Sequence, residues 1–195
     1  MTFEEYVPLA LKTEKTEPFF HNDHQWSRQM HGAVGLCTEV GELLDAVKKN
    51  LIYGKPLDMH NVREEVGDAL WYLVLYLDAC GFSHKSLEHE SPSEAGERCD
   101  ALALCIDLTY RSTYLLTQTN ARISSAVAAS SAREDLEAIY VLLWDIVNEA
   151  GAGSMSDIFE LNLAKLAERY KKGFSKEAAL NRDLEAERKV LEGQK

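Results

Sequence analysis

The sequence predicts an all-α fold: a helical bundle built on a hairpin of two acidic helices, with an inserted helical pair. The amphipathic segments of the chain show the three- and four-residue spacing of apolar positions that helices require. Residues 35–81 contain two such segments joined by a turn, and each carries a pair of acids three residues apart. A length of 195 residues with 46% hydrophobic content suits one core, so we expect residues 1–195 to form a single domain.

The N-terminal region combines a short helix with a loop. Residues 3–11 form an amphipathic segment, and the chain then passes Pro18 to reach a polar and aromatic run, residues 21–26. This run holds two histidines and an aspartate, which could bind a metal, but its many turn-forming residues favour a surface loop. Trp26 could stack on a nucleobase, although we expect it to pack on the core.

Both acidic helices have recognisable ends. The first is expected from about residue 27 or 31 to residue 51, where the run Tyr53-Gly54-Lys55-Pro56 breaks it. The second is expected from residue 62 to residue 80 and stops at Gly81. Asn61 is a candidate N-cap, with Glu64 three residues later as in a capping box.

The acid pairs are Glu39 with Glu42 on the first helix and Glu65 with Asp68 on the second. Each pair lies at the edge of its apolar stripe, because a helix turns about 100° per residue. Antiparallel packing would bring the four carboxylates together, where they would repel one another unless a cation lay between them. Oxygen ligands suit Mg²⁺, so the pattern predicts a magnesium site. A solvated acidic edge remains the alternative.

Two further side chains share the acid faces. Lys49 lies two turns after Glu42 and could reach a phosphate bound at the metal, or could be an exposed lysine favoured by the helix dipole. Tyr72 lies one turn beyond Asp68 and offers a hydroxyl group.

The middle of the chain, residues 83–151, is predicted as a helical insertion. Residues 83–97 are polar and indicate a loop, and helical patterns follow at 98–117 and 133–150. Residues 133–151 repeat the pattern of residues 63–81 at an offset of seventy, with Ala138 in place of Asp68. The insertion is therefore either a degenerate second hairpin or a pair of unrelated helices.

The last predicted helix, residues 157–171, aligns Asn162, Lys165 and Arg169 on one polar face. Two cations and an amide could cradle phosphate oxygens, or could form a solvated basic face. The charged tail, residues 174–195, is expected to be a C-terminal arm.

Acids outnumber bases 32 to 21, for a net charge of −11, which argues against a nucleic-acid polymer or an anionic membrane as partner. No signal segment or membrane span is recognisable, so we expect a cytoplasmic protein.

Three stretches stand out together: residues 35–46 (GLCTEVGELLDA), residues 64–72 (EEVGDALWY) and residues 162–166 (NLAKL) with Arg169-Tyr170. They resemble the MazG-like nucleoside triphosphate pyrophosphohydrolases of the all-α NTP pyrophosphatase superfamily. The resemblance covers about residues 28–82 and 154–185.

The resemblance implies an all-helical homodimer or homotetramer that cleaves an NTP or dNTP to the monophosphate and pyrophosphate with Mg²⁺, or Mn²⁺ as a substitute. The implied metal ligands are Glu39, Glu42, Glu65 and Asp68. The implied phosphate contacts are Tyr72, Lys165 and Arg169, with Asn162 in support. We favour Glu39 as the general base.

Two departures from the family pattern stand out: Thr38 occupies a position where some relatives have another acid, and compact relatives lack the long insertion. The main alternative is a catalytically silent helical module that binds a nucleotide or a partner. A di-iron carboxylate bundle ranks last, because the motif positions lack Glu-x-x-His.

Overall fold

The computed structural model describes residues 1–14, 23–89, 100–122, 126–170 and 183–192. Within those ranges the secondary structure is helical, without strands, so the all-α prediction is confirmed. The helices are α1 (Phe3–Leu11), α2 (His24–Tyr53), α3 (Met59–Cys80), the 3₁₀ helix η1 (His84–His89), α4 (Ala101–Asn120), α5 (Ala126–Ala150), α6 (Met155–Arg169) and α8 (Leu184–Leu191).

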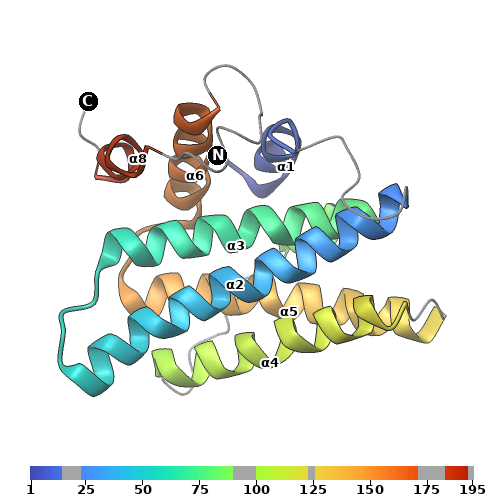
Figure 1. Ribbon diagram of the computed structural model, residues 1–195, viewed down its shortest axis with the longest axis horizontal. Helices are drawn as coiled ribbons and strands as arrows, with labels where there is room; N and C mark the ends of the chain where they lie inside the picture. The colour runs from blue at the N-terminus through green and yellow to red at the C-terminus, as the bar shows by residue number, and fades with distance from the viewer. Residues whose placement is uncertain (15–22, 90–99, 123–125, 171–182, 193–195) are drawn as a thin grey trace.

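Four long helices, α2 to α5, form the bundle (Figure 1). Helix α2 packs on α3 and α4, and α5 packs on α4 and α3. Fully buried leucines from α2, α3 and α4, such as Leu43, Leu73 and Leu108, fill the space between the helices. The shorter helices α1, α6 and α8 lie along the α3 side of the bundle, so α3 has neighbours on both sides (Figure 1).

The N-terminal ends of α2 and α3 are set by aspartates. Asp23 accepts a hydrogen bond from the backbone N–H of Trp26, which starts α2 at His24. The loop expected over residues 21–26 is therefore wrong for His24 to Trp26, while His21 and Asn22 lie outside the described residues. The predicted Asn61 cap is also wrong, because the Asp58 side chain caps α3 three residues earlier.

Trp26 is half-buried at the edge of the bundle rather than inside the core. Its indole N–H donates to the carbonyl oxygen of Thr119 at 3.3 Å, and the guanidinium of Arg122 lies 4.3 Å from its ring centroid. The tryptophan thus joins α2 to the end of α4.

The inserted pair is present as α4 and α5. Both helices extend further into the Ser/Ala-rich stretch than expected: α4 ends at Asn120 and α5 begins at Ala126. Residues 84–89 of the expected loop form η1, whereas residues 90–99 lie outside the described ranges.

The repeated sequence pattern of residues 63–81 and 133–151 has a structural counterpart at the ends of α3 and α5. Gly81 and Gly151 both adopt a left-handed conformation, with φ of 71° and 67°. The next backbone N–H returns to the helix in each case, from Phe82 to Leu77 and from Ala152 to Val147. Glycine-terminated helices commonly end this way, so duplication remains a hypothesis.

Helix α6 begins two residues earlier than expected, because Ser154 and Asp157 form a capping box. In the tail, α8 packs on α6 and α3 of the same chain. The remaining tail residues, 174–182 and 193–195, lie outside the described part of the chain. Among the described helices, none combines the length and the apolar character needed to cross a bilayer.

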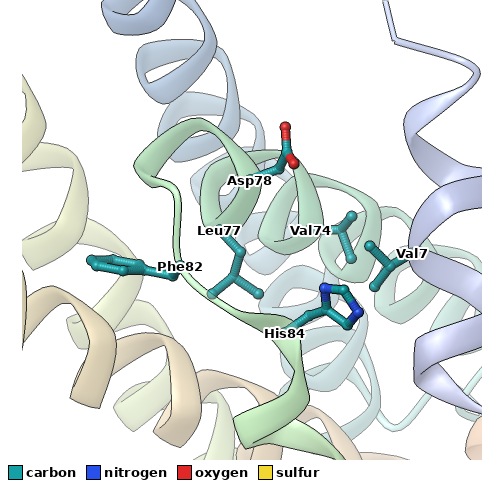
Figure 2. Close-up of a pocket in the computed structure, with 6 residues that line it drawn as sticks. All are labelled: Val7, Val74, Leu77, Asp78, Phe82 and His84. Carbon is teal, nitrogen blue, oxygen red and sulfur yellow. The ribbon is translucent and has the colours of Figure 1, made fainter.

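A small cavity of about 20 Å³ lies between α1, α3 and the segment that leads into η1 (Figure 2). Its lining consists of Val7, Val74, Leu77, Asp78, Phe82 and His84. The volume is about that of a single water molecule, and the site residues predicted from the sequence do not line it.

Two glycines of α2 give a matched test of the packing of α2 on α3. A Cβ at Gly35 would overlap the ring of Tyr72 on α3, whereas a Cβ at Gly41 would meet no atom within 4 Å. Gly35→Ala should lower the free energy of unfolding by about 1–3 kcal/mol. Gly41→Ala should raise it by about 0.5–1 kcal/mol, because alanine is the better helix former. Urea unfolding measures both, and a stabilised Gly35→Ala variant would contradict the described contact.

Candidate metal centre

Three of the four predicted acids meet where α2 packs on α3. Glu39, Glu42 and Glu65 each place one carboxylate oxygen within 4.8 Å of the others. The i, i+3 spacing sets Glu39 and Glu42 on one face of α2, and the packing of α3 brings Glu65 to that face. The cluster therefore arises from the hairpin itself.

Burial and mutual repulsion act on these carboxylates. Glu65 is only 5% exposed and Glu39 is half-buried, while Glu42 faces solvent. Loss of hydration, followed by repulsion from Asp68 and Glu42, raises the pKa of Glu39 to about 7. Burial and the charges of Glu42 and Glu39 raise the pKa of Glu65 further, to about 9. A solvated acidic edge would not bury Glu65 in this way.

The donor set fits a hard divalent cation. It consists of carboxylate oxygens, which Mg²⁺ and Mn²⁺ prefer, and the raised pKa values of Glu39 and Glu65 reflect burial and repulsion among the acids, which a bound cation would relieve. The Asn61 side chain donates a hydrogen bond to Glu65, which orients this buried carboxylate. Thr38, which departs from the family pattern, donates its hydroxyl hydrogen bond to the carbonyl oxygen of Gly35 at 2.7 Å.

Asp68 is engaged differently from the other three acids. Its Oδ1 accepts a hydrogen bond from Asn162 Nδ2 at 2.8 Å, and its Oδ2 accepts one from Lys165 Nζ at 2.5 Å. Lys165 also lies 3.3 Å from Glu64 Oε1. Both oxygens of Asp68 are thus bonded to α6, which sets this residue apart from the three-glutamate cluster.

The α6 residues are buried beside the acids rather than exposed on a basic face. Lys165 is fully buried and Asn162 is 2% exposed. The close approach of α6 to α3 depends on Gly67, because a Cβ there would lie 3.1 Å from Asn162. Sequence spacing placed Asn162 and Lys165 on one face, but only the packing shows that this face meets Asp68.

Tyr72 lies beside the acids within an aromatic group. Its ring centroid is 5.5 Å from that of His31 and 5.0 Å from that of Trp71. Burial, together with the charges of Glu39 and Asp68, raises the pKa of the Tyr72 hydroxyl. The hydroxyl therefore stays protonated at neutral pH and can donate a hydrogen bond.

The other two predicted phosphate contacts have acidic partners. Arg169 donates from Nε and Nη2 to the carboxylate of Glu187 on α8, at 2.9 and 2.7 Å. Lys49 lies at the surface, with its Nζ 2.6 Å from Asp45 Oδ2. Arg169 retains N–H groups beyond the two that Glu187 occupies.

Sequence reasoning missed two residues of this region, Tyr6 and Glu187. Tyr6 is fully buried in α1 and donates its hydroxyl hydrogen bond to Asn162 Oδ1 at 2.8 Å. Glu187 is buried in α8 against Arg169. Both lie more than a dozen residues from their partners, and no local spacing signals such contacts.

The buried acid Glu65 predicts a pH-dependent stability in metal-free protein. Its raised pKa means that the folded state binds more protons than the unfolded state, so stability falls as pH rises from the ordinary glutamate pKa towards about 9. Glu65→Gln should therefore raise the free energy of unfolding by about 1–2 kcal/mol at pH 8 and change it little at pH 5. Thermal unfolding in EDTA measures the difference, with exposed Glu149→Gln as control. Equal destabilisation by Glu65→Gln at both pH values would contradict the electrostatic account.

The comparison with known families agrees with the resemblance of the motifs. The model of the MazG nucleotide pyrophosphohydrolase domain matches residues 33–90, which include the four motif acids and Tyr72. The α6 residues lie outside the matched segment. No curated protein and no solved structure matches the chain. Over residues 33–90, this chain is therefore similar to the MazG nucleotide pyrophosphohydrolase domain.

Proposed function

We propose that this protein is a Mg²⁺-dependent nucleoside triphosphate pyrophosphohydrolase that converts an NTP or dNTP to its monophosphate and pyrophosphate. The observation that carries the proposal is the cluster of Glu39, Glu42 and Glu65 on α2 and α3, inside the segment that matches the family. An acidic protein with a net charge of −11 needs a cation to bind a polyphosphate, and this cluster suits one.

The three clustered glutamates would hold the divalent cation, with Asp68 as the fourth ligand when α6 releases one of its oxygens. When bound, the cation would neutralise charge on the phosphates and lower the pKa of a water molecule. Mn²⁺ should substitute for Mg²⁺, because both prefer oxygen ligands.

Glu39 is the proposed general base. In the metal-free protein, burial and the neighbouring acids raise the pKa of Glu39 to about 7, so this carboxylate is more basic there than an ordinary glutamate. In the proposed step Glu39 takes a proton from water as the water oxygen bonds to the α-phosphorus. The bond from that phosphorus to the α,β-bridging oxygen breaks, and pyrophosphate leaves with the bonding electrons.

The proposed phosphate contacts are Lys165, Arg169 and Tyr72, with Asn162 in support. Lys165 could exchange its bond to Asp68 for one to a phosphate oxygen. Arg169 is held in orientation by Glu187 and keeps donors for a phosphate. Lys49 could take part only by leaving Asp45.

For the whole chain, we propose one domain over residues 1–195, with residues 83–151 as a helical insertion or degenerate second hairpin and residues 174–195 as a C-terminal arm. We further propose a cytoplasmic homodimer or homotetramer that acts on free nucleotides and binds neither nucleic-acid polymers nor membranes.

A catalytically silent nucleotide- or partner-binding module is the second candidate. One observation favours it: Asp68 and Arg169, two expected site residues, already have ionic partners within the chain, Lys165 and Glu187. An enzyme must release or share these partners when its substrate binds, whereas a silent module need not.

Pyrophosphate release from a panel of NTPs and dNTPs distinguishes the two candidates. The native chain should release pyrophosphate only with Mg²⁺ or Mn²⁺, and Glu42→Gln should reduce kcat/KM by at least about 100-fold, because it removes a ligand charge. Glu149→Gln removes an exposed acid on α5 and should leave the rate unchanged. A nucleotide that binds without being hydrolysed would reject the enzyme and favour the silent module.

A further inference from the structure

We propose that Tyr6 of α1 is a positioning residue of the acid site, because it fixes the orientation of the Asn162 amide and, through it, Asp68. The inference rests on the proposed function. It adds the N-terminal helix, which lies outside the segment matched by the family model, to the parts that determine the reaction.

A directed chain of hydrogen bonds links the three residues. Tyr6 Oη donates to Asn162 Oδ1 at 2.8 Å, and Asn162 Nδ2 donates to Asp68 Oδ1 at 2.8 Å. An ionised carboxylate can only accept hydrogen bonds, so the NH₂ group of Asn162 must face Asp68 and its carbonyl oxygen must face Tyr6. The hydroxyl of Tyr6 supplies the donor that this orientation requires.

The surroundings leave the amide few other partners. Tyr6 is fully buried and Asn162 is 2% exposed, so solvent has little access to replace a lost bond. Gly67 on α3 brings the backbone close to the amide, since a Cβ there would lie 3.1 Å from both Cβ and Nδ2 of Asn162. The site therefore depends on the tyrosine hydroxyl to hold the amide in one orientation.

The ring of Tyr6 has a separate packing role. It stacks on Phe159 of α6, with centroids 4.9 Å apart and planes 22° apart, and it lies near Phe3. Tyr6→Phe keeps this packing and removes only the hydroxyl. The variant should fold, with the carbonyl oxygen of Asn162 left without its donor and the amide free to turn.

Tyr76→Phe is the matched control. Tyr76 is also buried, and its hydroxyl forms a 2.8 Å hydrogen bond with Thr119 Oγ1 between α3 and α4. Both substitutions remove one buried hydroxyl from α-helical packing. Of these two tyrosines, only Tyr6 hydrogen-bonds to Asn162, so an effect specific to the amide separates positioning from a general loss of stability.

The first readout is the side-chain NH₂ signal of Asn162 in ¹⁵N NMR spectra of the full chain, assigned by its absence in Asn162→Ala. Tyr6→Phe should shift this signal and speed its hydrogen exchange by about tenfold, whereas Tyr76→Phe should leave it unchanged. An unaltered amide in Tyr6→Phe would overturn the proposal. This readout needs no turnover, so it remains decisive even if the protein hydrolyses no nucleotide.

The second readout is a double-mutant cycle on pyrophosphate release. Tyr6→Phe should lower kcat about fivefold with KM within about twofold, the effect of one lost hydrogen bond. In the Asn162→Ala background the same substitution should have no further effect, because Tyr6 acts through the amide. Losses that multiply would show a role independent of Asn162 and would contradict the proposal.

Discussion

The repulsion among Glu39, Glu42 and Glu65 is the constraint on which the rest of the structure depends. The bundle holds three carboxylates within 4.8 Å of one another and buries one of them. The raised pKa values of Glu39 and Glu65 show that burial and the neighbouring acids make it costly in free energy to ionise these two carboxyl groups in the folded chain. Packing of α2 on α3 compels the arrangement, since Gly35 admits the Tyr72 ring and the helices meet closely. A divalent cation would relieve the repulsion.

Side chains of α1, α6 and α8 form hydrogen bonds with the other charged and polar groups near the acid cluster. Lys165 and Asn162 of α6 bond to both oxygens of Asp68, while its charge still contributes to the raised pKa of Glu39. Tyr6 of α1 orients Asn162, and Glu187 of α8 orients Arg169. The three shorter helices on the α3 side thus supply polar groups next to the acids, and the pair α4 and α5 completes the core on the other side of the hairpin.

Helical periodicity was enough to predict the fold class and the two acid pairs, because residues at i and i+3 share a face whatever lies opposite. It could not separate Glu65 from Asp68, since only the packing of α6 gives Asp68 two donors. Helix starts were misjudged at His24 and Met59, where an aspartate one residue earlier supplies the cap. Tyr6 resembled any buried aromatic of an amphipathic helix, and a single sequence carries no signal for a bond to a residue so distant.

Binding of Mn²⁺ by electron paramagnetic resonance tests the central claim, that the glutamate cluster holds a divalent cation, most directly. Adding metal-free protein to a Mn²⁺ solution should remove the signal of free Mn²⁺, and added Mg²⁺ should restore it. Glu65→Gln should weaken Mn²⁺ binding by about 10–100-fold. Equal affinity for Mn²⁺ in the native chain and in Glu65→Gln would show that the cluster is not the metal site and would contradict the account.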